Sequence, residues 1–276
     1  MMDGTRVTSE MERLKHRLNA VWSSADFGRI ATSFEAGAIQ FVGRLGLSSG
    51  VSVLDVACGT GNLAIPAARK GADVTGLDIV PEFIGQARSV ARAEGLGAKF
   101  DVGDAESLPY ADGSFDVVMS MFGAMFAPRP DVVVDELTRV CKAGGVIAMA
   151  NWTPGGFVGE MFKITGKHVP PPAGMPSPLR WGDEDTVCER FGSKVSDLVV
   201  TRRMIDFVFP FGAADVVEHF RKFYGPTLKA FETLGDDKRQ AALRKDLEEL
   251  WAVNNASGNG STLVTSEYLE VKAIRA

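Results

Sequence analysis

The sequence predicts an α/β fold built on a doubly wound, largely parallel sheet. Two observations carry this prediction. Short apolar runs alternate with helical stretches from about residue 51 to residue 152, as expected for parallel strands that are buried on both faces. The first unit joins two apolar runs, 51–56 and 74–77, through a glycine-rich turn and a helical stretch. Because such crossovers are right-handed, successive units wind helices onto both faces of one sheet.

The composition is that of a globular protein. The chain has 276 residues, of which 45% are hydrophobic and 24% charged, and its formal net charge is −5. It is long enough to bury a core, and it gives no reason to expect a nucleic-acid partner, which normally requires a basic face. No stretch resembles a signal peptide or could span a bilayer, so we expect a cytoplasmic protein without membrane insertion. The scattered cysteines, Cys58, Cys141 and Cys188, predict no metal site.

Residues 1–45 are predicted to form an N-terminal helical lid. A helix that begins after Ser9 in a capping box carries a narrow apolar stripe, formed by Met11, Leu14, Leu18 and Val21. Such a stripe must pack on another surface. That surface is the protein's own core, the active site beneath a lid, or a second copy in a homo-oligomer. A polar and aromatic bridge then leads to a helix predicted over 35–45.

The turn after the first apolar run indicates which ligand the sheet binds. Gly59, Gly61 and Ala64 match the pattern of dinucleotide sites, so an NAD-dependent oxidoreductase is one interpretation. In that case a pyrophosphate would lie on the backbone N–H groups of the turn, close to the negative charge of Asp55. This carboxylate is better suited to a ligand that has an ammonium and a sulfonium but no phosphate. S-adenosylmethionine is such a ligand.

Acidic residues mark the ends of three successive strands. Asp55 lies at the end of the first strand, Asp78 ends the second, and Asp104 follows the third, which is predicted over 99–102 after a helix over 81–93. The carboxyl ends of parallel strands lie at one edge of a sheet, where open α/β folds bind their ligands. We therefore expect the three carboxylates to line a binding crevice, in which Asp78 accepts hydrogen bonds from ribose hydroxyls.

The fourth and fifth strands are predicted over 115–121 and 146–150, with a helix between them that begins at Pro130. The loop after the fourth strand is apolar for a loop. We expect its Met125 and Phe126 to face a pocket.

After Trp152 the alternation of strands and helices breaks. Residues 153–181 are rich in glycine and proline, which predicts a loop-rich wall on the ligand side of the sheet rather than a pair of helices. Residues 153–198 and 212–260 are predicted as a substrate cap. His168 is the best-placed imidazole for a general base, although the sequence favours the interpretation of an incidental loop histidine.

The C-terminal part contains two alternating segments, 199–211 and 261–276, which are predicted as strands. Helices are predicted between them, over 213–223, 227–234 and 236–253.

Three segments resemble the class I S-adenosylmethionine-dependent methyltransferases, and among these the small-molecule enzymes of ubiquinone and menaquinone biosynthesis. The segments are VLDVACGTGNLA, GLDIVPEFIGQAR and GDAESLPYADGSFDVVMSMFG, and the resemblance extends from about Phe27 to Trp152. It implies a Rossmann-like, seven-stranded sheet that an antiparallel C-terminal pair completes. It also implies that residues 46–152 form the core that binds S-adenosylmethionine.

The resemblance further implies which residues contact this cofactor. Ala57, Gly59 and Gly61 would contact its methionine end, and Asp78 and Ile79 its ribose and adenine. The expected cofactor-binding residues are Phe27, Asp55, Ala57, Gly59, Gly61, Asn62, Asp78, Ile79, Asp104, Ala105, Met121 and Phe122. The expected substrate pocket is lined by Trp22, Met125, Phe126, Trp152, His168 and Trp181.

Methyl transfer to a small apolar or aromatic metabolite is the function that these patterns favour. The aromatic and methionine side chains of the expected pocket fit a quinone, terpenoid or polyketide-like acceptor, methylated on carbon or oxygen. The alternatives are the NAD-dependent oxidoreductase and a protein that binds the cofactor without catalysis, since a fold does not fix a function.

Overall fold

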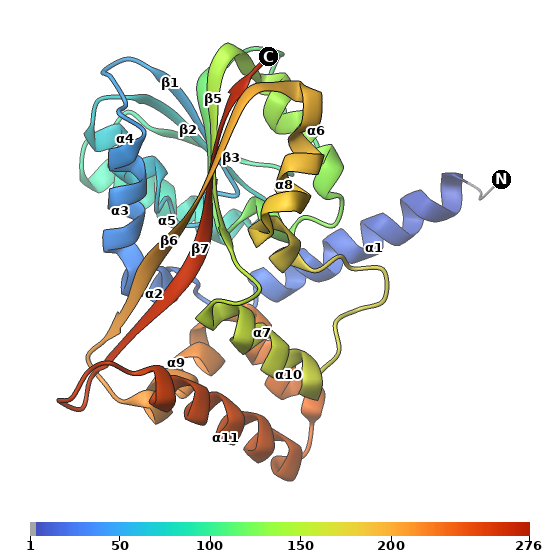
Figure 1. The fold of residues 1–276 in the computed structure, drawn as a ribbon, viewed down its shortest axis with the longest axis vertical. Coiled ribbons are helices and arrows are strands. Elements are labelled where there is room, and N and C mark those ends of the chain that lie inside the picture. The colour runs from blue at the N-terminus through green and yellow to red at the C-terminus, as the bar shows by residue number, and fades with distance from the viewer. Residues whose placement is uncertain (1–3) are drawn as a thin grey trace.

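The computed structural model describes residues 4–276, and the side chains of its first helix from Met11 onward. In this part of the chain seven strands form one sheet, in the order β3-β2-β1-β4-β5-β7-β6 (Figure 1). Strands β1 to β5 pair in parallel, and β7 runs antiparallel between β5 and β6. The strands are β1 (Ser52–Val56), β2 (Asp73–Asp78), β3 (Lys99–Val102), β4 (Phe115–Met121), β5 (Cys141–Trp152), β6 (Val195–Phe209) and β7 (Thr262–Arg275). The predicted seven-stranded, mostly parallel sheet is confirmed.

Helices cover both faces of the sheet, as the doubly wound prediction requires (Figure 1). One face carries α3 (Glu35–Arg44), α4 (Ala64–Arg69) and α5 (Pro81–Ala93), and the other carries α6 (Pro130–Val140) and α8 (Glu184–Phe191). Central strands buried between two helical layers need apolar side chains on both faces. In β1 the side chains of Val53, Leu54 and Val56 are fully buried.

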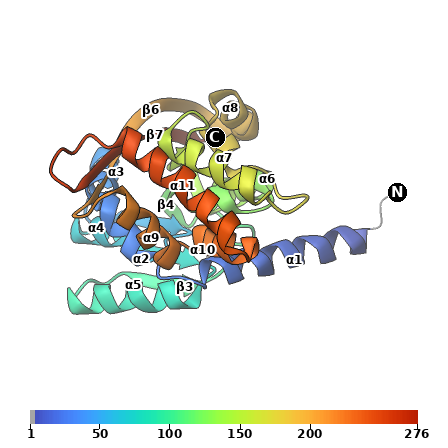
Figure 2. The same ribbon diagram turned by 90° about the horizontal axis from the view of Figure 1, so that it is seen from below.

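A helical cap lies beyond the carboxyl ends of the parallel strands, in the lower half of Figure 1. It consists of α7 (Phe157–His168), α9 (Ala213–Phe223), α10 (Gly225–Leu234) and α11 (Asp237–Asn254). The long strands β6 and β7 extend from the sheet to this cap. Helix α1 (Gly4–Trp22) packs beside α10 and projects from the body toward its N-terminal end, and the short α2 (Gly28–Ala31) connects it to the core (Figures 1 and 2).

The prediction of a loop-rich wall was wrong for the segment that forms α7. Phe157, Val158 and Met161 share one buried face of this helix. Most prolines of the region come later, from Pro170 onward, and residues that precede a proline avoid the helical conformation. The helix therefore ends at His168, and of the predicted wall residues 153–156 and 169–177 are irregular.

Several boundaries also differ from the prediction; for example, the strand predicted over 199–211 is Val195–Phe209. Helix α1 begins at Gly4, so Ser9 lies inside the helix rather than at its N-cap. Strand β5 begins at Cys141 rather than at Val146, because its pairing with β4 contains an irregularity that absorbs the glycine-rich segment.

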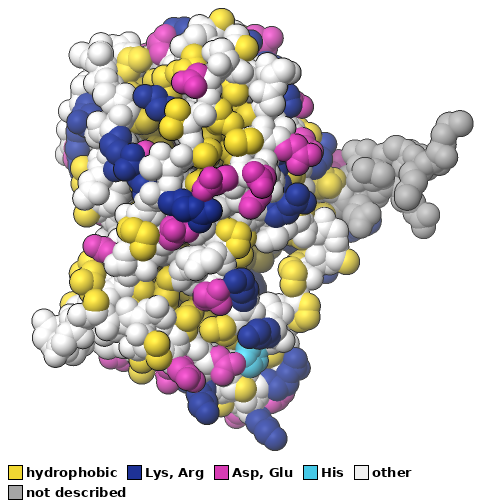
Figure 3. Space-filling model, viewed as in Figure 1, with side chains coloured by type: hydrophobic (Ala, Val, Ile, Leu, Met, Phe, Trp, Pro, Cys, Tyr) yellow, Lys and Arg dark blue, Asp and Glu magenta, His cyan; other side chains and the backbone are white. Residues whose placement is uncertain are grey.

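The surface in the view of Figure 3 intersperses basic and acidic side chains, whereas a face that binds nucleic acid concentrates basic ones. Within residues 4–276, no helix is both long and apolar enough to cross a membrane. The same residues contain no group of three or more His, Cys, Asp or Glu side chains that could hold a metal ion.

The cap is joined to the extended strands by an aromatic cluster around Trp251 of α11. The Trp251 side chain is 1% exposed. Its ring centroid lies 4.5 Å from that of Phe157 in α7, 5.3 Å from that of Phe220 in α9 and 5.9 Å from that of Phe209 in β6. Trp251 thus connects three separate elements.

Replacing Trp251 by alanine is expected to lower the free energy of unfolding by about 3–5 kcal/mol, because a large buried side chain is removed where the surroundings relax only partly. Urea unfolding followed by circular dichroism measures this. Val253→Ala is the control, since Val253 is 79% exposed on the same helix; we expect a change within about 0.5 kcal/mol. Equal effects of the two substitutions would contradict the role of Trp251.

Candidate active site

A cavity lies at the carboxyl edge of the sheet, where the loops after β1, β2, β3 and β4 meet α1. We call it the edge cavity. All but one of the expected cofactor-binding residues line it; these are Phe27, Asp55, Ala57, Gly59, Asn62, Asp78, Ile79, Asp104, Ala105, Met121 and Phe122. The exception is Gly61, which lies behind the turn. Its φ of +93° and a clearance of 3.0 Å between a built Cβ and Ile65 Cγ1 show that it shapes the turn instead.

The Asp78 carboxylate ties the glycine-rich turn to the end of β2. Its Oδ2 accepts a hydrogen bond from the Gly59 N–H at 2.8 Å, and its Oδ1 accepts one from the Val80 N–H at 2.9 Å. Gly59 has a φ of +54°, in the left-handed region that glycine adopts readily. A carboxylate has about four acceptor positions. Two therefore remain for hydroxyl groups of a ligand.

Burial raises the pKa of Asp78 to about 6, although hydrogen bonds from the backbone oppose the rise. The folded chain therefore retains a proton between the ordinary pKa of 3.8 and about 6. The contribution of Asp78 to stability falls as the pH rises through that window. The affinity for a ligand that donates hydroxyl hydrogen bonds to Asp78 should instead rise with pH through that window, since an ionised acceptor forms stronger hydrogen bonds.

Asp55 is buried and bonded to the protein backbone, whereas the sequence predicted a carboxylate that faces the ligand. It is 1% exposed, and its Oδ2 accepts a hydrogen bond at 3.0 Å from the N–H of Ala64, the first residue of α4. Burial raises its pKa well above the ordinary range. The raised pKa opposes ionisation, so it does not favour the negative charge that we expected at the end of β1. The Asp55 carboxyl group instead fixes α4 relative to the strand through its hydrogen bond to Ala64.

Asp104 is paired with α1 at the mouth of the edge cavity. Lys15 Nζ lies 2.5 Å from Asp104 Oδ2 and 2.6 Å from Glu106 Oε2, and the Glu106 side chain is fully buried. Nearby, Asn19 Nδ2 donates a hydrogen bond to the Ile79 carbonyl oxygen at 2.8 Å. Sequence reasoning did not identify Lys15, Asn19 or Glu106, because no motif links them to the strand ends.

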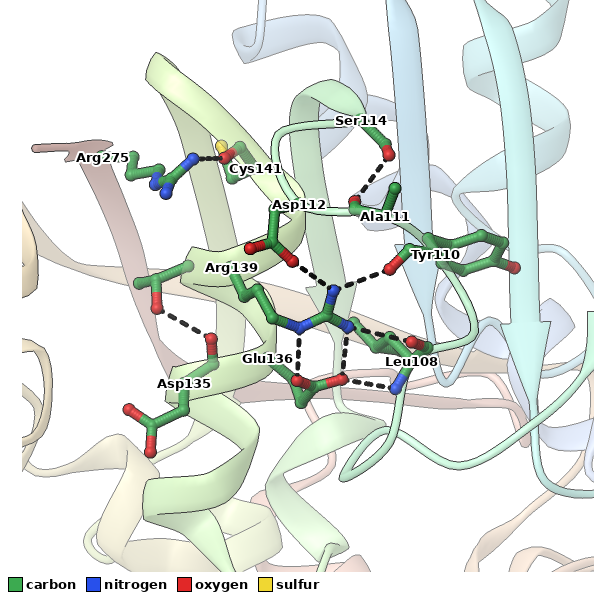
Figure 4. A network of polar contacts seen from close by, with 11 residues as sticks. Leu108, Tyr110, Ala111, Asp112, Ser114, Asp135, Glu136, Arg139, Cys141 and Arg275 are labelled. Atoms are coloured by element: carbon green, nitrogen blue, oxygen red, sulfur yellow. Dashed lines mark hydrogen bonds and ion pairs between the residues drawn. The ribbon is translucent and has the colours of Figure 1, made fainter.

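The segment that carries Asp104 is anchored to α6 by the network in Figure 4. Arg139 donates hydrogen bonds to the carbonyl oxygens of Leu108 and Tyr110, at 2.9 and 2.7 Å. Glu136 accepts one from the Leu108 N–H at 2.6 Å and pairs with Arg139. These contacts satisfy backbone groups that a surface loop would leave to water, so the wall of the edge cavity is held in place.

The loop after β4 forms the opposite wall. Phe122 has a φ of +54°, which is rare for a bulky residue and is maintained by its surroundings. Its ring stacks on that of Trp152, with centroids 3.5 Å apart. A Cβ on the next residue, Gly123, would lie 2.5 Å from the Ala57 carbonyl oxygen, so only glycine permits this approach to the loop after β1.

An apolar groove adjoins the edge cavity, bounded by α1, α7, residues 169–178 and the start of α10. Leu18, Trp22 and Phe126 line both. Beside them lies a small aromatic junction, which is lined by Trp22, Phe27, Ile30, Phe34, Phe122, Phe126, Trp152, Val158, Met161, Phe207, Phe220 and Tyr224. The predicted pocket residues Trp22, Phe126 and Trp152 thus lie at these cavities.

Three predicted pocket residues lie elsewhere. His168 is the last residue of α7, and this end of the helix lies next to α11. Its Nε2 is 2.7 Å from Asp246 Oδ2 of α11. Trp181 is 1% exposed and packs under the guanidinium of Arg190. Met125 is 2% exposed within the core. None of the three lines the edge cavity, the apolar groove or the aromatic junction, and we do not retain His168 as a candidate base.

The comparisons with known proteins include a methyltransferase family and two named methyltransferases. The model of a methyltransferase domain family matches residues 54–149. An uncharacterised protein of Mycobacterium tuberculosis is 40% identical over 248 residues, which cover 88% of this chain and 90% of that protein. The 2-methyl-6-phytyl-1,4-hydroquinone methyltransferase of a Synechocystis strain is 38% identical over 128 residues, and the methyltransferase GfsG of Streptomyces halstedii 42% over 115; these cover 46% and 41% of this chain, and 40% and 41% of those proteins.

Solved structures show the same fold. The YcgJ protein from Bacillus subtilis superimposes with a TM-score of 0.58 at 17% identity, covering 87% of this chain and 98% of that one. A putative methyltransferase from Bacillus halodurans gives 0.57 at 18% identity, with the same shares covered.

Replacing Asp78 by asparagine is expected to weaken S-adenosylmethionine binding by about 1–3 kcal/mol, because the uncharged carboxamide has one acceptor oxygen fewer for the ribose hydroxyls and accepts more weakly than a carboxylate. Isothermal titration calorimetry measures the dissociation constant. Between pH 5 and pH 7.5 the affinity of the unmodified chain should rise, by up to about tenfold, as Asp78 ionises. In the variant it should stay level.

Asp73→Asn is the matched control, because Asp73 is exposed at the opposite end of the same strand. An unchanged dissociation constant for Asp78→Asn would contradict the placement of the ribose at this carboxylate.

Proposed function

The chain belongs to the class I S-adenosylmethionine-dependent methyltransferases, and from this premise we propose that it methylates a small apolar or aromatic metabolite held in the apolar groove. Its cofactor is S-adenosylmethionine. The NAD-dependent oxidoreductase interpretation of Gly59, Gly61 and Ala64 is therefore abandoned. The observation that carries the proposal about the acceptor is that the edge cavity and the groove share Leu18, Trp22 and Phe126.

The charges in the edge cavity fit this cofactor. Among the described residues, its ionisable lining consists of Asp55, Asp78, Asp104 and Lys15, of which Asp55 is the acid whose ionisation burial opposes. Lys15 is already paired with Asp104 and Glu106, so the described residues of the cavity offer no unpaired cation for a phosphate. When bound, S-adenosylmethionine supplies an electrophilic methyl group, which accepts an electron pair from the acceptor while the carbon–sulfur bond pair passes to sulfur.

We assign the binding roles as follows. Asp78 accepts from the ribose hydroxyls, while Asp104 and Ala105 face the adenine edge. The turn at Ala57 and Gly59 takes the methionine end. Phe27, Met121 and Phe122 enclose the remaining surface. All of these residues line the edge cavity.

The groove favours an apolar acceptor. Apart from Arg17 and Lys163, both exposed, its lining side chains are uncharged. Two relatives that match less than half of the chain are named as methyltransferases, one of them for a phytylated hydroquinone. This supports a quinone, terpenoid or polyketide-like acceptor. The described lining also contains no imidazole, so we infer a carbon or oxygen nucleophile that needs no strong base.

Helix α1 acts in this proposal as a lid over the edge cavity. It is tied to the strand ends by Lys15 and Asn19, and its apolar side faces the groove. The N-terminal half of α1 projects from the body (Figure 2). A contact with a second subunit is therefore the alternative role for this helix.

Replacing Lys15 by alanine is expected to speed hydrogen exchange of the α1 amides about tenfold, because an ion pair to the buried Glu106 is lost. Mass spectrometry of residues 11–22 reports this. Arg13→Ala, an exposed change on the same helix, should leave the rates unchanged. Unaltered exchange in Lys15→Ala would mean that apolar packing alone holds the helix.

The groove is tested by filling it. Gly166 of α7 lines the groove, and a Cβ built on it meets nothing within 4 Å. Gly166→Trp should therefore fold normally and bind S-adenosylmethionine unchanged, yet lose at least about tenfold in methyl transfer from labelled cofactor to the small-molecule fraction of a cell extract.

Gly85→Trp is the control, since Gly85 is exposed on α5 with equally open surroundings. Full transfer by Gly166→Trp would remove the groove from the acceptor's path. Cofactor binding without transfer by the unmodified chain, to this fraction or to a panel of phenols and hydroquinones, would favour the alternative of a non-catalytic protein.

A further inference from the structure

Tyr224 stands apart from the other tyrosines of the chain. The Tyr110 hydroxyl donates a hydrogen bond to Asp101 at 3.0 Å, and the Tyr268 hydroxyl accepts one from Arg44 at 2.7 Å. The residue Tyr224 is 6% exposed, but among the described residues its hydroxyl has no hydrogen-bond partner. Three other buried side chains have a polar atom that is inaccessible to solvent and has no hydrogen-bond partner; they are Asn151, Trp181 and Arg190. The Tyr224 hydroxyl is not one of these inaccessible atoms. The hydroxyl therefore borders open space.

Tyr224 lies between the two binding regions. Tyr224 lines both the aromatic junction and the apolar groove. Its ring centroid lies 5.6 Å from that of Trp22 and 6.3 Å from that of Phe27, and both of these residues line the edge cavity. Within the part of the chain that the structure describes, no charged side chain lines the junction. A polar group of a bound acceptor would find few partners there other than this hydroxyl.

The position of Tyr224 is fixed by the corner between α9 and α10. Its N–H donates to the Phe220 carbonyl oxygen at 2.9 Å, and its own carbonyl oxygen accepts from the Leu228 N–H at 3.0 Å. The following residue is Gly225, where a Cβ would overlap the Val21 carbonyl oxygen of α1. The corner is thus packed tightly against α1, which preorganises the ring.

We propose that the Tyr224 hydroxyl donates a hydrogen bond to a neutral oxygen of the methyl acceptor, and so selects acceptors with a carbonyl or hydroxyl group at the end that faces the cofactor. This inference rests on the proposed function of the groove. A buried donor left without a partner loses the hydrogen bonds that water would supply, so acceptors that lack the oxygen bind less well.

The hydroxyl acts as a donor and not as a base. Burial raises the pKa of Tyr224, so the phenol stays protonated at neutral pH. The methyl group forms its bond to the acceptor as the carbon–sulfur bond breaks; the acceptor then loses its proton to bulk water outside the junction, and the tyrosine proton stays in place. An ammonium-bearing acceptor would meet no carboxylate in the aromatic junction, which disfavours amine substrates.

The test compares two neutral probes of similar shape, 2-acetylnaphthalene and 2-isopropylnaphthalene, of which only the first carries an oxygen. Equilibrium dialysis against the full chain saturated with S-adenosylhomocysteine gives both dissociation constants. The ratio of the two constants is compared between variants, so that the difference in probe hydrophobicity cancels. Tyr224→Phe removes one oxygen atom and should shift the ratio against the ketone by about five- to tenfold. Its thermal melting and its binding of S-adenosylhomocysteine should not change.

Two further variants isolate the effect. Tyr110→Phe removes a hydroxyl outside the three cavities and should leave the ratio unchanged. Thr227→Val removes a neighbouring hydroxyl from the groove. An unshifted ratio in Tyr224→Phe, or an equal shift in Thr227→Val, would overturn the proposal. Absence of probe binding, or binding that Gly166→Trp does not weaken, would instead overturn the groove assignment and the proposal with it.

Discussion

The hydrogen bonds of the buried Asp78 carboxylate hold the site together. An acid that is 7% exposed carries a large desolvation cost unless backbone donors compensate for it, and here Gly59 and Val80 supply them. The same bonds set the distance between the glycine-rich turn and the end of β2. The edge cavity exists because this turn is pinned there. Asp55, bonded to the first turn of α4, fixes the other end of the turn in the same way.

In the function proposed above, the cofactor and the methyl acceptor bind to different parts of the molecule. The edge cavity is formed mainly by loops at the ends of parallel strands, which a continuous core holds rigid. The apolar groove is formed by α1, α7, α10 and an irregular segment, which pack through side chains. Acceptor specificity can therefore change through the cap while the cofactor site stays constant. Tyr224 and Trp22 lie where the two parts meet.

Aromatic side chains line that meeting point because it must exclude water without offering competing charges. Phe122 stacks on Trp152, and Trp22 packs edge-to-face on Phe126. Large rings exclude water over a wide area at a low cost in side-chain entropy. In such surroundings one hydroxyl has a larger influence on ligand choice than it would have in water.

The sequence by itself determined the sheet, the glycine-rich turn and the acids at the strand ends, because strand and helix periods and turn chemistry are local signals. It identified Asp78 and Asp104 for that reason. Only the tertiary structure decided what these acids contact. Lys15 lies 89 positions from Asp104, and such a spacing leaves no pattern in the chain. The same limit applies to His168, which α7 directs toward Asp246, and to Tyr224, whose unpartnered hydroxyl appears only when α1, α9 and α10 pack together.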